Sequence, residues 1–164
     1  METCTRCGKG ELNGLAVEDS MDVAGHSFSA SLPARRCDAC GDILIDARVL
    51  KDFEHAVVLA LANSGQRTGA VLRALRKGVG LTPSRVADLL DVPENLVAEW
   101  EADQLPVPPQ AAAVLRSFVL SRLSGASQPI DRLSLLRHPG RLAKKVRLQI
   151  VRALDGFTPK VAMA

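Results

Sequence analysis

Aromatic side chains are scarce in this chain of 164 residues, which contains no tyrosine, one tryptophan and four phenylalanines. Aromatic residues favour strands and fill much of the core of a large sheet, so their scarcity favours helices packed through leucine, valine and alanine. Hydrophobic residues make up 47% of the chain and charged residues 24%, which excludes a wholly disordered polypeptide. The length suits one ordinary domain or two small ones.

A long apolar run is also missing, because no stretch reaches the roughly 18 residues typical of a membrane-spanning helix. Residues 1–7 contain no apolar core of the kind that a secretion signal requires. We therefore expect a cytoplasmic protein that has no membrane as a partner. In that reducing compartment, cysteines are more often metal ligands than members of disulfide bonds.

Recognisable catalytic sets are missing as well. The chain has three histidines, and they combine with no serine and aspartate, glycine-rich phosphate loop or open metal site in any known catalytic pattern. We therefore expect a protein that is not an enzyme.

The four cysteines form two pairs with the spacing typical of a structural zinc site. Two residues separate the members of each pair, so a tight turn can direct both sulfurs at one Zn²⁺ ion, with Zn–S distances of about 2.3 Å. Four thiolates leave no position for water, which disfavours a catalytic zinc, and disulfides or a redox dithiol are the remaining alternatives. Gly8 and Gly41 follow the two pairs and provide the backbone freedom that such turns need. The expected zinc ligands are Cys4, Cys7, Cys37 and Cys40.

Between the cysteine pairs, short apolar runs predict strands at residues 12–17 and 27–32, with breaks at 19–20 and 25–26. This region has few large apolar side chains and needs a metal to hold its fold. His26 is expected near the cysteines, as a loop or surface histidine rather than a ligand.

Apolar residues recur every three or four positions in residues 46–62, which predicts an amphipathic helix. The polar, glycine-containing residues 63–69 then predict a hinge between two modules that move independently.

Four short helices are predicted after the hinge, at residues 70–77, 83–90, 94–101 and 109–123. Thr82 is the expected N-cap of the second of these helices, because Pro83 suits the first helical position. The second and third helices are joined by a three-residue turn, which is typical of a helix-turn-helix DNA reader. A four-helix unit with no role in DNA binding is the alternative.

In this helical region, the apolar faces should be buried and the opposite faces should meet DNA. The expected buried residues are Val86, Leu89, Leu90, Leu96, Val97 and Trp100. The expected DNA-binding residues are Asn95, Ser84, Arg85, Glu94, Ala98, Glu99, Arg76 and Lys77.

Two patterns in residues 1–123 resemble known families. One comprises Cys4, Cys7, Gly10, Leu12, Leu32, Pro33, Ala34, Cys37, Cys40 and Gly41. It resembles the zinc finger of MqsA-type (YgiT-type) antitoxins. The other comprises Leu75, Arg76, Lys77, Gly80, Leu81, Thr82, Val86, Ala87, Leu89, Leu90, Val92, Trp100 and Glu101. It resembles the helix-turn-helix of the Cro/repressor (XRE) family.

The resemblance implies a homodimeric transcriptional regulator, an antitoxin that represses its own toxin–antitoxin operon. Its helix-turn-helix half would bind double-stranded operator DNA, and its zinc half would dock a cognate toxin. Asn95 matches a base-reading residue of the family, whereas Glu99 replaces an arginine and Pro83 replaces a glutamine. Because carboxylates repel phosphates, the alternative is a protein-interaction module, toxin-neutralising or dimerising, whose helix-turn-helix no longer binds DNA specifically.

The C-terminal extension carries the whole excess of positive over negative charge in the chain. Residues 1–68 have a net charge of −3, residues 69–123 of zero and residues 124–164 of +6. Helices are predicted at residues 130–137 and 141–154, the second with apolar residues on one side and basic residues on the rest. Its apolar side would serve dimer or core packing and its basic side would contact phosphates; binding to a membrane surface is a weaker alternative.

Together these predictions describe an α+β protein. A small, β-rich, zinc-ribbon-like module spans residues 1–45, and a connecting helix and hinge span residues 46–68. An all-α, Cro/repressor-like domain follows in residues 69–123, and a basic helical extension in residues 124–164.

Overall fold

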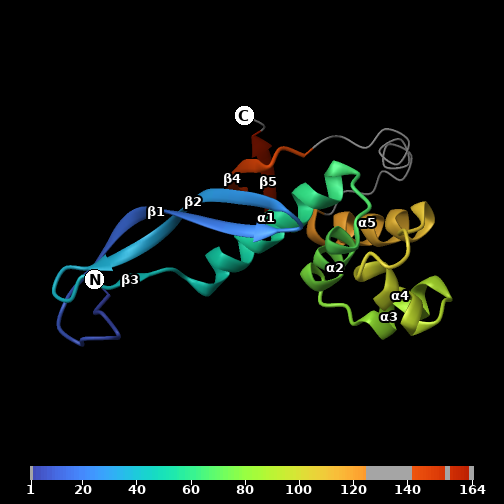
Figure 1. Ribbon diagram of the computed structural model, residues 1–164. Coiled ribbons are helices and arrows are strands. Elements are labelled where there is room, and N and C mark those ends of the chain that lie inside the picture. Colours follow the sequence, from blue (N-terminus) through green and yellow to red (C-terminus); the bar gives the residue numbers. More distant parts are fainter. Residues whose placement is uncertain (1, 125–141, 154–155, 163–164) are drawn as a thin grey trace.

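The structure is a computed structural model that describes residues 2–124, 142–153 and 156–162 (Figure 1). This part of the chain is α+β, as predicted, with a sheet of five strands and five helices. The strands are β1 (Leu12–Val23), β2 (His26–Cys37), β3 (Ile43–Leu44), β4 (Lys145–Ala153) and β5 (Gly156–Ala162). The helices are α1 (Ala47–Ser64), α2 (Gly69–Gly78), α3 (Pro83–Leu90), α4 (Glu94–Glu101) and α5 (Pro109–Ser124).

A long hairpin, β1–β2, dominates the N-terminal part. Its twelve-residue strands pair antiparallel from Leu12 opposite Cys37 to Val23 opposite His26. The predicted break at residues 19–20 is therefore wrong: Asp19 pairs with Ala30 inside the ladder, because a strand with one solvated face tolerates polar residues. At about 3.3 Å per residue, the two ends of the hairpin lie about 36 Å apart.

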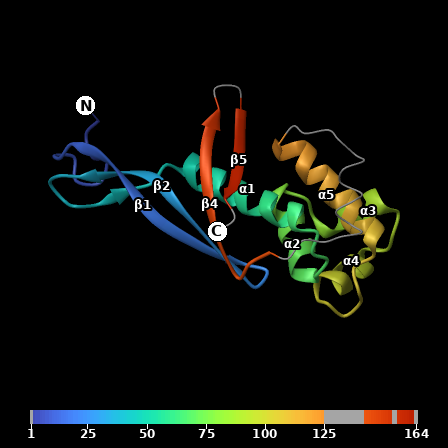
Figure 2. The same cartoon turned by 90° about the horizontal axis from the view of Figure 1, so that it is seen from above.

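The C-terminal segment extends the sheet. Strand β4 lies parallel to β2, with Phe28 opposite Val146 and Ala30 opposite Leu148, and β5 pairs antiparallel with β4. The sheet order is β1-β2-β4-β5, with β3 paired to β2 (Figure 2). The segment thus brings a strand with a buried apolar face onto the edge of the hairpin.

This segment corrects the helix predicted at residues 141–154. Leu142, Val146 and Ile150 are four residues apart, a spacing that fits a helical turn and also two steps of a strand. Leu148 decides between the two: it is buried beside Val146, while Arg147 between them is exposed. The helix predicted at residues 130–137, and residues 141 and 154, lie outside the described residues.

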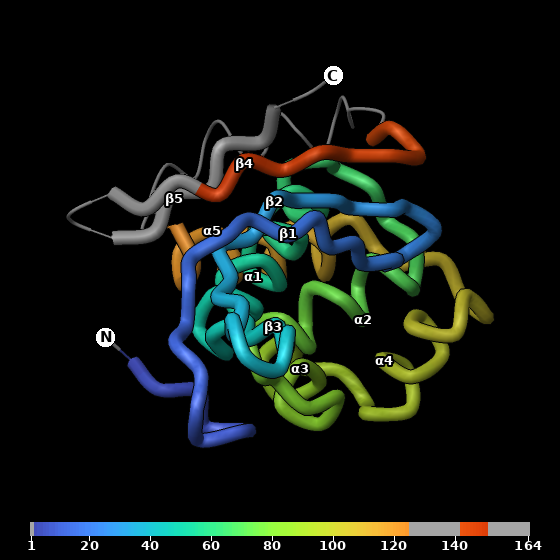
Figure 3. Tube along the Cα trace, turned by 90° about the vertical axis from the view of Figure 1, so that its left-hand side faces the viewer, coloured from blue at the N-terminus to red at the C-terminus, as the bar shows by residue number. Residues whose placement is uncertain are grey.

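Helix α1 forms the centre of the core. It packs against the sheet on one side and against α2 and α5 on the other, and nine of its 18 residues are buried (Figure 3). One continuous cluster therefore joins Phe28 and Leu32 of β2 to Leu61 of α1 and Trp100 of α4. Cys4 and Cys37 are buried outside this cluster.

The segment predicted as a hinge is held by hydrogen bonds to β2 and to α5. The Gln66 side-chain oxygen lies 3.1 Å from the Nε2 atom of His26, and the Gln66 carbonyl accepts a hydrogen bond from the Arg116 guanidinium of α5. The other imidazole nitrogen of His26 lies 2.9 Å from the Ala143 carbonyl, just before β4. Ser64 and Gly65, which precede Gln66, are buried.

The helices begin where the sequence provides caps. The side chains of Asp46, Thr68 and Thr82 accept hydrogen bonds at the start of α1, α2 and α3, and Pro83 is the first residue of α3. Within residues 2–124, 142–153 and 156–162, no helix combines the length and apolar character needed to span a bilayer.

Candidate functional site

The two cysteine pairs converge at the open end of the hairpin. The four sulfur atoms all lie within 4.8 Å of one another. Cys4 Sγ lies 3.9 Å from Cys40 Sγ, and Cys7 Sγ lies 3.7 Å from Cys37 Sγ. A tetrahedral ion with bonds of about 2.3 Å to sulfur requires edges of about 3.8 Å. The predicted ligands are therefore brought together in an arrangement that could bind a metal ion.

The two turns that carry the sulfurs have the same backbone design. The Gly8 N–H donates to the Cys4 carbonyl at 2.9 Å, and the Gly41 N–H donates to the Cys37 carbonyl at 3.0 Å. Both glycines have positive φ, 68° and 73°, so their predicted role in these turns is confirmed. Gly10 has a different role, because a Cβ atom there would overlap the sulfur of Cys37.

Polar contacts tie the two turns to each other. Glu11 and Asp38 exchange two hydrogen bonds: the Glu11 N–H donates to Asp38 Oδ1 at 2.9 Å, and the Asp38 N–H donates to the Glu11 carbonyl at 3.1 Å. Arg6 and Asp42 form an ion pair at 2.6 Å. These contacts leave no local signal in the sequence, because each joins residues at least 27 positions apart.

The pKa values of two thiols are shifted in opposite directions. The backbone N–H groups of Lys9 and Gly10 lower the pKa of Cys7 from 9.0 to about 6. The Asp42 N–H lowers the pKa of Cys40, but the hydrogen bond with Cys37, burial and the other sulfurs outweigh it and raise that pKa to about 12. Four sulfurs this close cannot all ionise without a cation among them, which is the chemistry expected of a thiolate metal site.

His26 is far from this centre, which corrects its predicted position. It is the first residue of β2, at the turn end of the hairpin, whereas Cys37 is the last. Instead of lying in a loop, the half-buried imidazole links the hairpin to Gln66 and Ala143.

Helices α3 and α4 are joined by the predicted three-residue turn, residues 91–93. Asp91 has a φ of 53°, and its N–H and that of Val92 both bond to the carbonyl of Ala87, which ends α3 and turns the chain sharply. Val86, Val97 and Trp100 are buried, as predicted. Leu89 is 49% exposed, so its predicted burial is wrong: together with Val114 of α5 it borders a shallow apolar hollow of about 90 Å³.

The outer face of α4 is solvent-exposed. Glu94, Asn95 and Ala98 are exposed and Glu99 is half-buried. The Asn95 amide donates to Glu99 Oε1 at 3.3 Å, which places both side chains on the same face of the helix. A polar strip of two carboxylates and one amide therefore runs along α4.

The other predicted DNA-binding residues divide into accessible and inaccessible ones. Ser84, Arg85 and Lys77 are exposed, and Arg85 lies 3.9 Å from Asp88 in an exposed ion pair. Arg76 is buried, so its predicted role as a DNA-binding residue is wrong.

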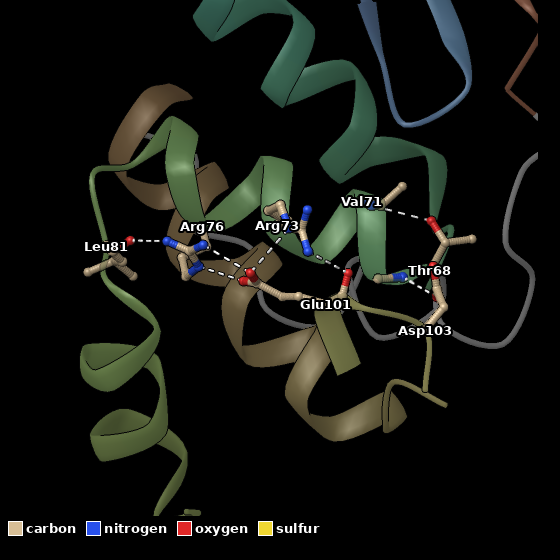
Figure 4. Close-up of polar contacts among 8 residues, drawn as sticks. Thr68, Val71, Arg73, Arg76, Leu81, Glu101 and Asp103 are labelled. Atoms are coloured by element: carbon tan, nitrogen blue, oxygen red, sulfur yellow. Dashed lines mark hydrogen bonds and ion pairs between the residues drawn. The ribbon is translucent and has the colours of Figure 1, made fainter. Parts of the chain in front are cut away.

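The Arg76 guanidinium is occupied inside the protein (Figure 4). Its Nε donates to Glu101 Oε1 at 2.5 Å, its Nη2 to Oε2 at 2.9 Å, and its Nη1 to the Leu81 carbonyl at 2.7 Å. Arg73 adds a hydrogen bond of 3.1 Å to the Glu101 carbonyl. The Arg76–Glu101 pair clamps α2 against the end of α4, because Glu101 is the last residue of α4. The two residues lie 25 positions apart in the sequence.

A second contact holds the same two helices together. The Gly69 N–H at the start of α2 donates to Asp103 Oδ1 at 2.6 Å, just beyond α4 (Figure 4). A Cβ atom at Gly69 would overlap the Trp100 carbonyl, so the two backbones approach too closely for any other residue. The orientation of α4 is thus fixed by contacts at both ends of α2.

Compared with models of known protein families and with curated proteins, the sequence matches none. The geometry of the cysteine cluster and of α3–α4 is therefore the basis for a functional proposal.

Proposed function

We propose that the protein is a DNA-binding transcriptional regulator with a structural zinc ion, in which α3 and α4 act as a helix-turn-helix. The observation that carries this proposal is the outer face of α4. This face is polar and exposed, while the opposite face is fixed by the buried side chains of Val97 and Trp100. A short helix held rigidly on a scaffold, with one free polar face, is what insertion into a major groove requires.

The dimensions support this role. Helix α4 has eight residues and is about 12 Å long, close to the width of the major groove. Asn95 lies in its first turn, where side chains of a recognition helix reach base edges, and its amide can pair with adenine. The weak, exposed bond from Asn95 to Glu99 is readily exchanged for one to a base.

The charges favour selective rather than tight binding. Glu94 and Glu99 repel phosphates, although a carboxylate can accept a hydrogen bond from cytosine N4. Exposed Lys77 and Arg85 offer compensating phosphate contacts. We therefore expect modest affinity for DNA, to which contacts with the bases contribute more than contacts with the phosphate backbone.

For the metal, zinc fits the cysteine cluster best. Four thiolates at tetrahedral separations suit Zn²⁺, and a shell closed by four protein ligands leaves no place for a substrate. Because Cys4 and Cys37 lie outside the apolar cluster, the ion would replace a hydrophobic core at this end of the hairpin.

A second role, docking a partner protein such as a toxin, is favoured by the position of the cysteine end. It lies at the opposite end of the molecule from α3 and α4 (Figure 1). Ile43 beside it is 48% exposed, and Leu50 on α1 is 37% exposed. A partner bound there would leave the α4 face free. The predicted homodimer would have to present its two α4 faces about one helical turn of DNA apart.

A DNA mobility-shift assay tests the proposed regulator. The probe is the DNA upstream of the protein's own gene, with a shuffled duplex as competitor, across a salt series. The wild-type protein should prefer the upstream DNA, and its affinity should fall as salt rises. An affinity that is equal for both duplexes contradicts the proposal.

Asn95→Ala is the sharpest variant for this assay. It should reduce discrimination by about 1–3 kcal/mol, because one bidentate base contact is lost. Asn13→Ala is the matched control, since Asn13 is an exposed asparagine on β1. Unchanged discrimination in Asn95→Ala would remove this residue from the interface.

A further inference from the structure

A second polar site lies at the C-terminal end of α2. It is an open cleft of about 470 Å³ between the first half of α1, the end of α2 and the end of α5. Its volume is in the range of pockets that hold small molecules of nucleotide size. Of the residues that line it, only Lys77 also has a part in the proposed DNA binding.

Three of the nine residues that line the cleft are cationic, and a fourth is a histidine. Lys51 and His55 come from α1, Lys77 from α2 and Arg122 from α5, against the single carboxylate of Glu54. Elsewhere in the described chain, arginines such as Arg6, Arg73 and Arg147 are paired with carboxylates. By contrast, Lys51, Lys77 and Arg122 form no ion pair with any residue that the structure describes.

Helix ends account for only part of this charge. Lys77 and Arg122 lie in the last turns of α2 and α5, where a cation also interacts favourably with the partial negative charge of the carbonyls. Lys51 and His55 lie inside α1, away from either end, so no helix terminus explains their presence. Three cations that have no ion-pair partner among the described residues, and one imidazole, thus line one space from three helices. Arg122 also lies over the Phe118 ring, 6.0 Å from its centroid.

We propose that this cleft binds the phosphate group of a phosphorylated small molecule. A phosphate has three acceptor oxygens and up to two charges, which matches one guanidinium fork and two ammonium groups from different directions. The ligand would be held by side chains, because the Gly80 and Leu81 N–H groups of the adjoining turn already bond to the carbonyls of Lys77 and Arg76.

The ligand would also change the state of His55. Burial, and secondarily the charge of Lys51, lowers the pKa of His55 below 6.5, against opposing effects of Asp52 and Glu54. A bound phosphate stabilises the imidazolium and raises that pKa, so the imidazole becomes another donor to the ligand.

Calorimetric titration of the full-length, metal-loaded protein with inorganic pyrophosphate tests the proposal. We expect saturable binding of one molecule per chain. Lys77→Gln and Arg122→Gln should each weaken it about tenfold, as expected for a lost charge-assisted hydrogen bond. Arg36→Gln and Lys145→Gln remove exposed charges outside the cleft and should leave it unchanged. All four positions are exposed, so circular dichroism should show an unaltered fold.

A histidine NMR titration gives an independent readout, with His55→Gln to assign the signal. The pKa of His55 should rise in pyrophosphate and stay low in chloride at equal ionic strength. A nonspecific DNA duplex is then added to the pyrophosphate complex. If the duplex displaces pyrophosphate, the cleft binds the phosphates of a DNA backbone. If pyrophosphate stays bound, the cleft binds the phosphate of a small molecule. The absence of saturable binding, or equal weakening by Lys77→Gln and Lys145→Gln, would overturn the proposal.

Discussion

The buried ion pair between Arg76 and Glu101 makes the sharpest stability prediction. Both side chains are less than a tenth exposed, and their guanidinium and carboxylate share two hydrogen bonds. Truncating Glu101 leaves the Arg76 charge buried without a carboxylate, which costs about 3–5 kcal/mol. Truncating Arg76 leaves Glu101 its longer contact of 3.4 Å with Arg73, so it should cost less. Since a domain of this size is stable by only about 5–15 kcal/mol, Arg76→Met or Glu101→Leu should lower the urea midpoint markedly.

The double variant distinguishes this explanation from general damage to the core. Arg76→Met with Glu101→Leu removes both charges, so it should cost clearly less than the sum of the single variants. Arg85→Ala is the control, because the Arg85–Asp88 pair is 3.9 Å long and more than 60% exposed on both sides, and should cost less than about 1 kcal/mol. Additive single costs, or an Arg76→Met cost as small as that of Arg85→Ala, would refute the reasoning.

Three further predictions concern other parts of the fold. Gly10→Ala should abolish stoichiometric metal binding, as measured by metal analysis, because its Cβ overlaps the Cys37 sulfur. Gly14→Ala is the control and should keep the metal, because the space around its Cβ is open. His26→Ala should speed hydrogen exchange of β2–β4 amides, because it removes both side-chain links to Gln66 and Ala143; unchanged exchange contradicts this. Because the pKa of His55 is lowered, the unfolded chain binds more protons than the folded one below pH 6.5. The free energy of unfolding, measured in urea, should therefore fall as the pH drops below 6.5, and it should fall less steeply in His55→Gln. Equal pH dependence in the two proteins contradicts this.

Local signals in the sequence predicted the helices well. Thr82, Pro83 and the turn before Glu94 define α3 and α4 within a few residues, so their bounds could be predicted without tertiary information. The cysteine spacing likewise predicted the cluster of four sulfurs, because two short turns constrain it.

Features that depend on distant partners could not be predicted this way. Residues 145–153 were predicted as a helix because an apolar spacing of four fits both periodicities, and only pairing with β2 favours the strand. Arg76 was predicted at the surface because its partner, Glu101, is distant in sequence. His26 was placed near the cysteines because the length of the hairpin depends on pairing across its whole ladder.

X-ray absorption at the zinc edge of the purified protein tests the central claim, a single ion held by both cysteine pairs. We predict one zinc per chain with four sulfur neighbours at about 2.3 Å. Cys40→Ser should replace one of these sulfurs with a lighter atom. A protein purified without stoichiometric metal, or a wild-type spectrum with fewer than four sulfur ligands, would contradict the account.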